Sequence, residues 1–350
     1  MTPSNEDPNR LLVEQAADLA GRAGLKGPFA LEPLPGGRNN RVYRLEAGGR
    51  PFLLKSYFRH RNDQRDRLGT EFGFIRFVWN RGQRAVPRPM AWDREANLGL
   101  YEFIEGRLLN PGQVTGEHVR QALDFCLAID EMKNDPEALD LPEASESCFS
   151  LDEHLACVDR RLERLQDMEA GDPVSREAAS FIAHELEVTW RRVREEVLKG
   201  GRVLLPGTDR RLTPEERCLS ASDFGFHNAL IQADGRPRFI DFEYAGWDDP
   251  AKMVCDFFSQ PAVPVPLAFF SWFEEALAAR FLEGEALKKR IRLVFPVHRI
   301  KWCCLMLNDF LPVGEERRRF AGRADQAERR KRQLDKVRIY LDETRRINRS

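Results

Sequence analysis

The dipeptide Asp234-Gly235 most constrains how this chain can fold, because it separates two short apolar-rich runs. Asp-Gly between such runs predicts a β-hairpin with a two-residue turn. If Asp234 and Gly235 are the turn residues, the strand pairing continues outward and places Asn228 directly opposite Asp241. The hairpin would then bring an amide oxygen and a carboxylate together at its open end. Such hard oxygen ligands suit Mg²⁺ beside nucleotide phosphates and water.

A third polar residue precedes the hairpin. Asp223 stands five residues before Asn228, in a loop kept tight by Gly225. Kinase-type phosphoryl transfer uses this order of residues: a base, then a metal-binding Asn, then a metal-binding Asp. We therefore take Asp223 as the candidate catalytic base, and Asn228 and Asp241 as the candidate metal ligands.

This block resembles the aminoglycoside phosphotransferase and choline kinase superfamily, small-molecule kinases that share the protein-kinase fold. The resemblance rests on SDFGFHN (222–228), on FIDFEYAGWDDP (239–250) and on Asp256 followed by two Phe. It implies an α+β, bilobal protein-kinase-like fold: a small N-lobe with an antiparallel sheet plus a helix, and a larger, mainly helical C-lobe. It also implies ATP or GTP and Mg²⁺ as cofactors. The chain departs from the pattern at Ala221-Ser222, since most members have His-Gly there and that His supports the loop.

A buried ion pair is predicted far upstream. Glu71 precedes Ile75, Val78 and Trp79 by four, seven and eight residues, which places its carboxylate on the buried face of a helix. A buried charge needs a partner, and Lys55 at the end of the preceding apolar strand is the natural candidate. By itself, Lys55 would better suit an edge strand with its amine in water, and Glu71 is what favours the ion pair. The resemblance implies the pair: a strand lysine on the α- and β-phosphates, held by a helix glutamate.

Two further segments are candidates for nucleotide contacts. Gly36 and Gly37 lie between two predicted strands and suit a loop whose N–H groups close over phosphates. An ordinary hairpin turn explains the two glycines equally well. In the family, a segment like Glu102 to Ile104 is the hinge whose backbone binds adenine, with Gly106 allowing a turn. A strand that simply leaves a sheet fits the same residues. The resulting division is an N-lobe over 1–105 and a C-lobe over 106–350, the latter with a helical substrate-binding region.

Several acidic residues follow Asp241. Glu243 and Asp248 are candidates for binding a cationic or polyhydroxyl substrate. Equally, Asp248 or Asp249 could cap the helix that begins at Pro250, and we favour Asp249 for that role. The resemblance implies that Asp256 braces the catalytic loop by hydrogen bonds.

Charge and composition exclude other classes. The formal net charge of −1 argues against a globally basic nucleic-acid binder. The segment 315–350 has 13 basic and 7 acidic residues, but Leu334, Val337, Tyr340 and Leu341 form an apolar stripe, which predicts a docked helix rather than a nucleic-acid site. The seven cysteines show no C-x-x-C spacing, and no apolar run reaches transmembrane length. We therefore expect a cytoplasmic protein with neither a membrane nor a nucleic-acid partner.

The leading hypothesis is an ATP-dependent phosphotransferase that moves the γ-phosphoryl group to a hydroxyl of a sugar, amino sugar, aminoglycoside or amino alcohol. The alternative, motivated by Ala221-Ser222, is a catalytically impaired kinase-fold regulator that binds nucleotide or a partner. A protein kinase is disfavoured because Phe242-Glu243 stands where Phe-Gly would begin an activation segment. A choline acceptor would require an aromatic cage, for which Trp247, Trp272 and Trp302 are available.

Overall fold

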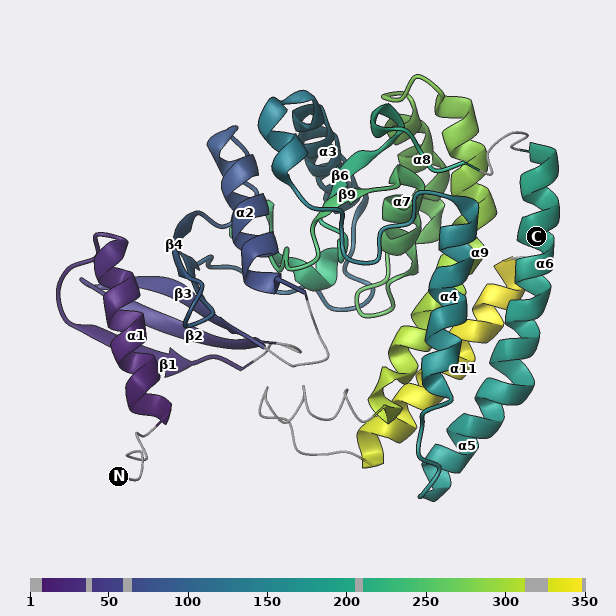
Figure 1. The fold of residues 1–350 in the computed structure, drawn as a ribbon, viewed down its shortest axis with the longest axis horizontal. Helices are drawn as coiled ribbons and strands as arrows, with labels where there is room; N and C mark the ends of the chain where they lie inside the picture. The colour runs from purple at the N-terminus through teal and green to yellow at the C-terminus, as the bar shows by residue number, and fades with distance from the viewer. Residues whose placement is uncertain (1–7, 36–39, 59–64, 205–209, 312–326, 348–350) are drawn as a thin grey trace.

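A five-stranded antiparallel sheet is the centre of the smaller lobe in the computed structural model, which describes residues 8–35, 40–58, 65–204, 210–311 and 327–347 (Figure 1). The strands follow the spatial order β1-β2-β3-β5-β4, and each neighbouring pair is antiparallel. The elements of this lobe are α1 (Pro8–Arg22), β1 (Phe29–Pro33), β2 (Asn40–Ala47), β3 (Arg50–Tyr57), α2 (Arg67–Asn80), β4 (Pro89–Asp93) and β5 (Leu98–Glu102).

The two helices of this lobe pack on different faces of the sheet. The apolar residues of α1 form one cluster with Leu54 and other buried residues of the sheet. On the other face, Phe72 of α2 stacks on Trp92 of β4, with 4.9 Å between ring centroids. Because side chains alternate along a strand, Lys55 points away from α1 and toward α2, where it contacts Glu71.

The larger lobe is mainly helical and is organised around α7, whose residues are all buried. Figure 1 shows α4, α5, α6, α9 and α11 gathered on the side far from the sheet. The helices are α3 (Gly116–Glu131), α4 (Leu151–Leu165), α5 (Pro173–Phe181), α6 (Glu187–Leu204), α7 (Pro250–Ser259), α8 (Phe270–Ala278), α9 (Gly284–Leu307) and α11 (Ala327–Ile347). Two two-stranded sheets lie toward the small lobe: β6 (Cys218–Ser220) with β9 (Gly246–Asp248), and β7 (Ala229–Ile231) with β8 (Pro237–Phe239).

The kinase-like α+β architecture predicted from the sequence is thus confirmed. The lobes are not independent, because α2 shares an apolar cluster with the larger lobe. Phe74 of α2 lies against Phe242, with ring centroids 5.5 Å apart. The boundary between 105 and 106 remains a prediction.

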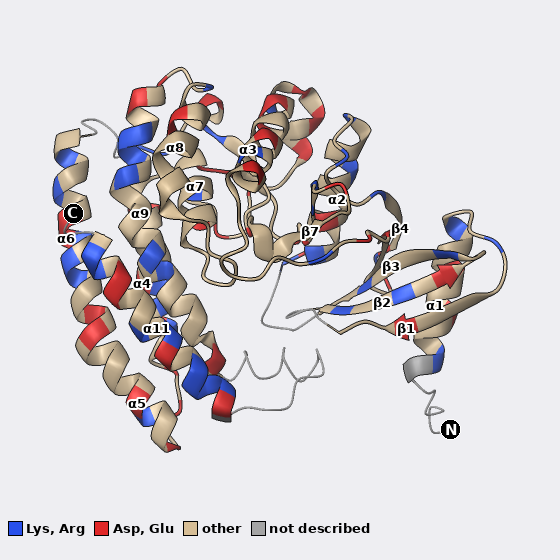
Figure 2. Ribbon diagram, turned by 180° about the vertical axis from the view of Figure 1, so that it is seen from behind, with Lys and Arg blue, Asp and Glu red and all other residues tan. Residues whose placement is uncertain are grey.

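The C-terminal helix α11 is docked as predicted. Its Leu334, Val337, Tyr340 and Leu341 are buried in a cluster with residues of α4, α5, α6 and α9. Figure 2 shows basic and acidic residues interspersed along the outer helices. No helix in the described part of the chain combines the length and apolar character needed to cross a membrane.

Candidate active site

Lys55 joins the two lobes at the base of the candidate site. Its Nζ lies 2.9 and 2.7 Å from the two carboxylate oxygens of Glu71, so the predicted ion pair is present. The same Nζ lies 2.8 Å from Oδ1 of Asp241. Burial opposes the charge, but Asp241 and Glu71 outweigh it and raise the pKa of Lys55 well above its usual value. Lys55 is therefore a fixed cation.

Glu71 is held from further directions. The hydroxyl of Tyr57 donates to its Oε2 at 2.6 Å, and the N–H of Phe242 donates to its Oε1 at 3.3 Å. Tyr57 also shares a hydrogen bond of 2.7 Å with the hydroxyl of Tyr101. These contacts fix the carboxylate that orients Lys55.

The predicted hairpin exists, but its predicted register is wrong by one residue. The turn has three residues instead of two: the N–H of Gln232 donates to the carbonyl of Arg236 at 3.0 Å, and Gly235 has a φ of +82°. Three-residue turns that end in a left-handed glycine are a common alternative to two-residue turns. Consequently the N–H of Ile240, not of Asp241, donates to the carbonyl of Asn228, at 2.9 Å.

Asp241 lies one residue beyond the hairpin pairing and has a left-handed backbone, with φ +69°. Its side chain remains about a third exposed, at 35%. Burial of the carboxylate raises the pKa of Asp241 to about 6, with Lys55 opposing the rise and Glu243 and Glu71 adding to it. Asp241 therefore offers an accessible oxygen beside the ammonium group of Lys55.

The loop after β6 begins with a strained turn. The N–H of Asp223 donates to the carbonyl of Ala221 at 2.9 Å, across Ser222 with φ +63°. A three-residue turn of this hand is rare for a non-glycine residue. The turn is held by the Oγ of Ser220, which accepts from the N–H of Ser222 at 2.9 Å.

The side chain of Asn228 contacts the backbone at the start of this loop. Its Nδ2 donates to the carbonyl of Asp223 at 2.9 Å, and its N–H donates to the carbonyl of Gly225 at 3.0 Å. Because Nδ2 is used in this way, the amide oxygen points to the other side, where no hydrogen bond from the described residues reaches it. The loop thus presents the side chains of Asp223 and Asn228 from one short segment.

His227 is a functional candidate that the sequence reasoning missed. Its Nε2 lies 3.1 Å from Oδ1 of Asp223. The available signal was the four-residue spacing between Asp223 and His227. A loop does not have the regular periodicity that would turn such a spacing into a predicted contact.

The remaining nucleotide candidates have different outcomes. Gly36 and Gly37 lie outside the described residues. Glu102 ends β5, and its Oε2 accepts from the N–H of Arg88 at 2.9 Å and from the guanidinium of Arg238 at 2.8 Å. Ile104 follows β5 outside any strand. The contact of adenine with the backbone from Glu102 to Ile104 stays a prediction.

Gly106 does not serve as the predicted turn residue. A β-carbon at this position would lie 3.0 Å from the carbonyl oxygen of Ile231 and 3.0 Å from Cβ of Leu230. Glycine is required there for close packing between the segment after β5 and the hairpin strand β7.

Glu243 and Asp248 do not present carboxylates to a substrate. Glu243 is 1% exposed; it accepts from Arg67 at 2.6 Å and from Nδ2 of Asn40 at 2.7 Å. Asp248 is fully buried and lies 2.6 Å from Nζ of Lys252. The sequence prediction failed because it showed neither the burial nor the basic partners. Asp249 caps α7 as expected, accepting from the N–H of Ala251 at 2.7 Å.

Asp256 does not brace the catalytic loop. Its side-chain partners are Lys252, on its own helix, and Lys301 and Trp302 on α9. Its carboxylate therefore ties α7 to α9 within the helical lobe.

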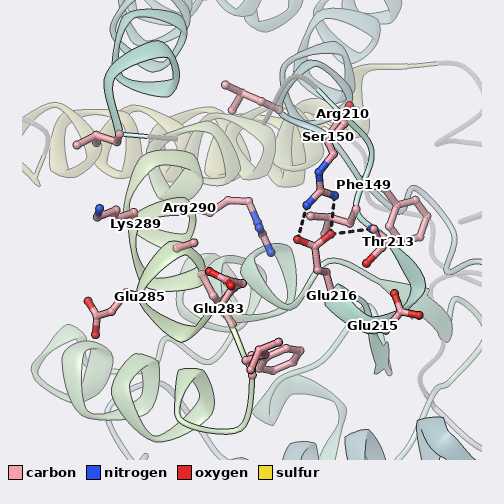
Figure 3. A pocket seen from close by; sticks show the side chains of 17 residues that line it. Phe149, Ser150, Arg210, Thr213, Glu215, Glu216, Glu283, Glu285, Lys289 and Arg290 are labelled. Carbon is pink, nitrogen blue, oxygen red and sulfur yellow. Dashed lines mark hydrogen bonds and ion pairs between the residues drawn. The ribbon is translucent and has the colours of Figure 1, made fainter. Parts of the chain in front are cut away.

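A separate pocket of about 630 Å³ lies among α4, the segment before β6 and the start of α9 (Figure 3). Arg210 and Glu216 lie together on one side of it and contact each other at 2.6 and 2.7 Å. Arg290 reaches from α9 toward Asp249, at 3.0 Å. None of Lys55, Asp223, Asn228 and Asp241 lines this pocket, so it is distinct from the candidate active site.

The fold is protein-kinase-like, and Lys55, Glu71 and Asp241 meet between its two lobes, beside the loop that carries Asp223 and Asn228. Residues 30–294 match the model of the phosphotransferase enzyme family, and the chain belongs to that family. No curated protein matches the chain in sequence.

Solved structures with similar folds share little sequence with the chain. An ethanolamine kinase from Plasmodium vivax is 12% identical with a TM-score of 0.58, over 97% of this chain and 89% of that one. A choline kinase from Streptococcus pneumoniae is 14% identical with a TM-score of 0.57, over 96% and 99%. A spectinomycin phosphotransferase in complex with ADP and spectinomycin is 13% identical with a TM-score of 0.56, over 95% and 93%.

Proposed function

We propose that the chain is an ATP-dependent phosphotransferase that moves the γ-phosphoryl group to a hydroxyl of a small molecule. The observation that carries the proposal is the position of Lys55, held by Glu71 of α2 and in contact with Asp241 beyond the hairpin. This arrangement places one cation where two lobes meet, next to a loop with Asp223 and Asn228. One structural neighbour described as a kinase, and one described as a phosphotransferase in complex with ADP, support the use of a nucleotide.

The residues fit a magnesium ion that is shared with the nucleotide. Asn228 and Asp241 offer one amide and one carboxylate oxygen, and the Asp241 side chain is accessible. The described residues contain no group of three or more His, Cys, Asp and Glu able to hold a metal by themselves. Mg²⁺ commonly binds through one or two protein oxygens together with phosphates and water, so these two ligands suffice. When bound, the ion neutralises charge on the β- and γ-phosphates.

In the proposed reaction, the protein positions reactants and supplies one base. Lys55 contacts the phosphates, and Glu71 keeps its amine in place. The acceptor hydroxyl attacks the γ-phosphorus while Asp223 accepts the hydroxyl proton, and ADP leaves. Phosphoryl transfer depends chiefly on positioning and electrostatics, so these few groups meet its requirements.

The acceptor can be a sugar, an amino sugar, an aminoglycoside or an amino alcohol. Choline is less favoured, because among the described residues no ring contact joins Trp247, Trp272 and Trp302 into a cage. Trp247 and Trp302 also donate their indole N–H to Ala138 and Asp256 in the protein interior.

The experiment is a transfer assay with Mg-ATP and a panel of choline, ethanolamine, spectinomycin, streptomycin and hygromycin B, extended to simple sugars and amino sugars. Mass detection of a phosphorylated product, at one ADP per product, supports the proposal. ATP binding without transfer to any acceptor would instead support the alternative, a kinase-fold regulator.

A further inference from the structure

The side chain of His227 contacts the proposed base directly and has no role in the reaction as described above. His227 lies in the short helical turn Phe226–Asn228, and its side chain is 16% exposed. Its Nε2 lies 3.1 Å from Oδ1 of Asp223. Nδ2 of Asn228 also contacts the carboxylate, at Oδ2, over a longer distance of 3.4 Å.

The contact with Asp223 indicates which ring nitrogen of His227 carries the hydrogen. An ionised carboxylate can only accept a hydrogen bond, so the hydrogen between the two groups belongs to Nε2. The second ring nitrogen, Nδ1, is buried and meets no hydrogen-bond partner within the described chain. A bare acceptor nitrogen is better tolerated there than a buried N–H without an acceptor. The neutral Nε2–H tautomer therefore fits the site.

The loop is shaped to admit this ring. A β-carbon on Gly225 would lie 2.9 Å from Nδ1 and 3.1 Å from Cε1 of His227, and 3.2 Å from Cγ of Gln260. A β-carbon at position 225 would therefore require the imidazole of His227 to shift.

We propose that His227 is a positioning residue, which donates from Nε2 to Asp223 and fixes the carboxylate in the orientation that receives the acceptor hydroxyl. This inference rests on the proposed function, because it concerns the base of that reaction. The effect of His227 is transmitted through Asp223, without contact to the nucleotide.

The kinetic test uses the full-length protein, Mg-ATP and the first acceptor in the panel that the wild type phosphorylates. We expect His227→Leu, which cannot donate, to lower kcat about 10- to 100-fold, because misplacement of a reacting group has effects of this size. The KM for ATP should change less than about twofold. His227→Gln places an amide N–H near the position of Nε2 and should restore most of the lost kcat. His184→Leu, at an exposed histidine of the helical lobe, is the matched control.

A spectroscopic test works without an acceptor. Long-range ¹H–¹⁵N NMR of histidine-labelled protein, with His227 assigned by its loss in His227→Gln, should show a hydrogen on Nε2 and none on Nδ1. The Nδ1–H tautomer would overturn the inference, since its Nε2 cannot donate to Asp223. This NMR measurement tests the inference even if His227→Leu fails to fold.

The outcomes of these experiments distinguish a failure of this inference from a failure of the proposed phosphotransferase function. A wild type that phosphorylates no acceptor overturns both. An active wild type with unchanged kcat in His227→Leu overturns only the role of His227. Equal losses in the Leu and Gln variants, accompanied by lower thermal stability in both, would also overturn it, because they would indicate a purely structural role.

Discussion

Backbone strain at single residues marks the candidate site. In the described part of the chain, four residues other than glycine have positive φ, and two of them, Ser222 and Asp241, belong to the proposed active site. Strained residues persist where the surrounding structure holds them, commonly at functional sites. At Asp241, the left-handed backbone is found together with the contact to Lys55. At Ser222, the turn directly precedes the proposed base.

Asp241→Asn should weaken nucleotide binding only when metal is present. The substitution keeps the size of the side chain but removes the negative charge proposed to bind Mg²⁺. We expect a loss of about 10- to 100-fold in Mg-ATP affinity, in line with the loss of a hydrogen bond or contact to a charged group. Calorimetric titrations with MgCl₂ and with EDTA measure the difference. Asp234→Asn in the hairpin turn is the control, and equal losses in the two variants would argue against a metal role.

Ser222→Gly should stabilise the fold. Glycine adopts a left-handed backbone without the cost of about 1 kcal/mol that a β-carbon adds. The contact from the Ser222 hydroxyl to the carbonyl of Ser145 is 3.5 Å, too long to offset this gain. Urea unfolding should show about 1 kcal/mol of added stability. Asn97→Gly should show no gain although Asn97 has φ +58°, because its side chain donates to the carbonyl of Tyr57 at 2.7 Å.

At the scale of elements, α4, α7 and α9 are tied by a buried polar network. His154 of α4 lies 3.0 Å from Asp249 at the start of α7 and 2.9 Å from His298 of α9. Arg290 holds the pKa of Asp249 at about 2 against the effect of burial, so this carboxylate is ionised and accepts from Nε2–H of His154. Nδ1 of His154 must then accept from Nε2–H of His298.

This network predicts loss of stability in mild acid. Burial lowers the pKa of His298 to about 3, with Asp256 opposing the shift and Lys301 and His154 adding to it. An unfolded histidine titrates near pH 6.5. Below that pH, His298 binds a proton in the unfolded chain but stays neutral in the folded protein. The contribution of neutral His298 to the free energy of unfolding is therefore complete above about pH 6.5 and declines as the pH falls toward 3. Urea midpoints at pH 7.5 and 5.0 should differ less in His298→Gln than in the wild type. An equal difference would contradict this assignment.

Some features of the helices and strands could be predicted from the sequence, and others could not. The pairing of Lys55 with Glu71 followed from burial and helical periodicity, and the hairpin followed from Asp-Gly. The register did not follow, because two- and three-residue turns share the same residues. Glu243 and Asp248 were misread as substrate ligands, since their partners, Arg67 and Lys252, are recognisable only when the fold brings them together.

At the scale of the whole molecule, Glu243 links the lobes. Its carboxylate accepts from Asn40 of β2 and from Arg67 at the start of α2, and both Arg67 and Glu243 have side chains only 1% exposed. Arg67 also donates to the hydroxyl of Tyr244 at 2.6 Å. The segment after Asp241 is thereby fastened to the sheet and to α2.

Glu243→Gln should destabilise the protein by about 3 kcal/mol, because it removes one charge of a buried ion pair. Equilibrium unfolding in urea measures the change. Glu196→Gln, which removes the exposed partner of Arg192 on α6, should cost less than about 0.5 kcal/mol. Similar values for the two variants would contradict the link between the lobes.

The central claim, phosphoryl transfer with Asp223 as base, is tested most directly by Asp223→Asn. We predict that this variant binds Mg-ATP with nearly unchanged affinity but loses transfer to the acceptor by about 10²- to 10⁴-fold, the usual contribution of a general base. Both quantities should be measured on the same preparation, by calorimetry and by mass detection of product. Full turnover in Asp223→Asn would contradict the account.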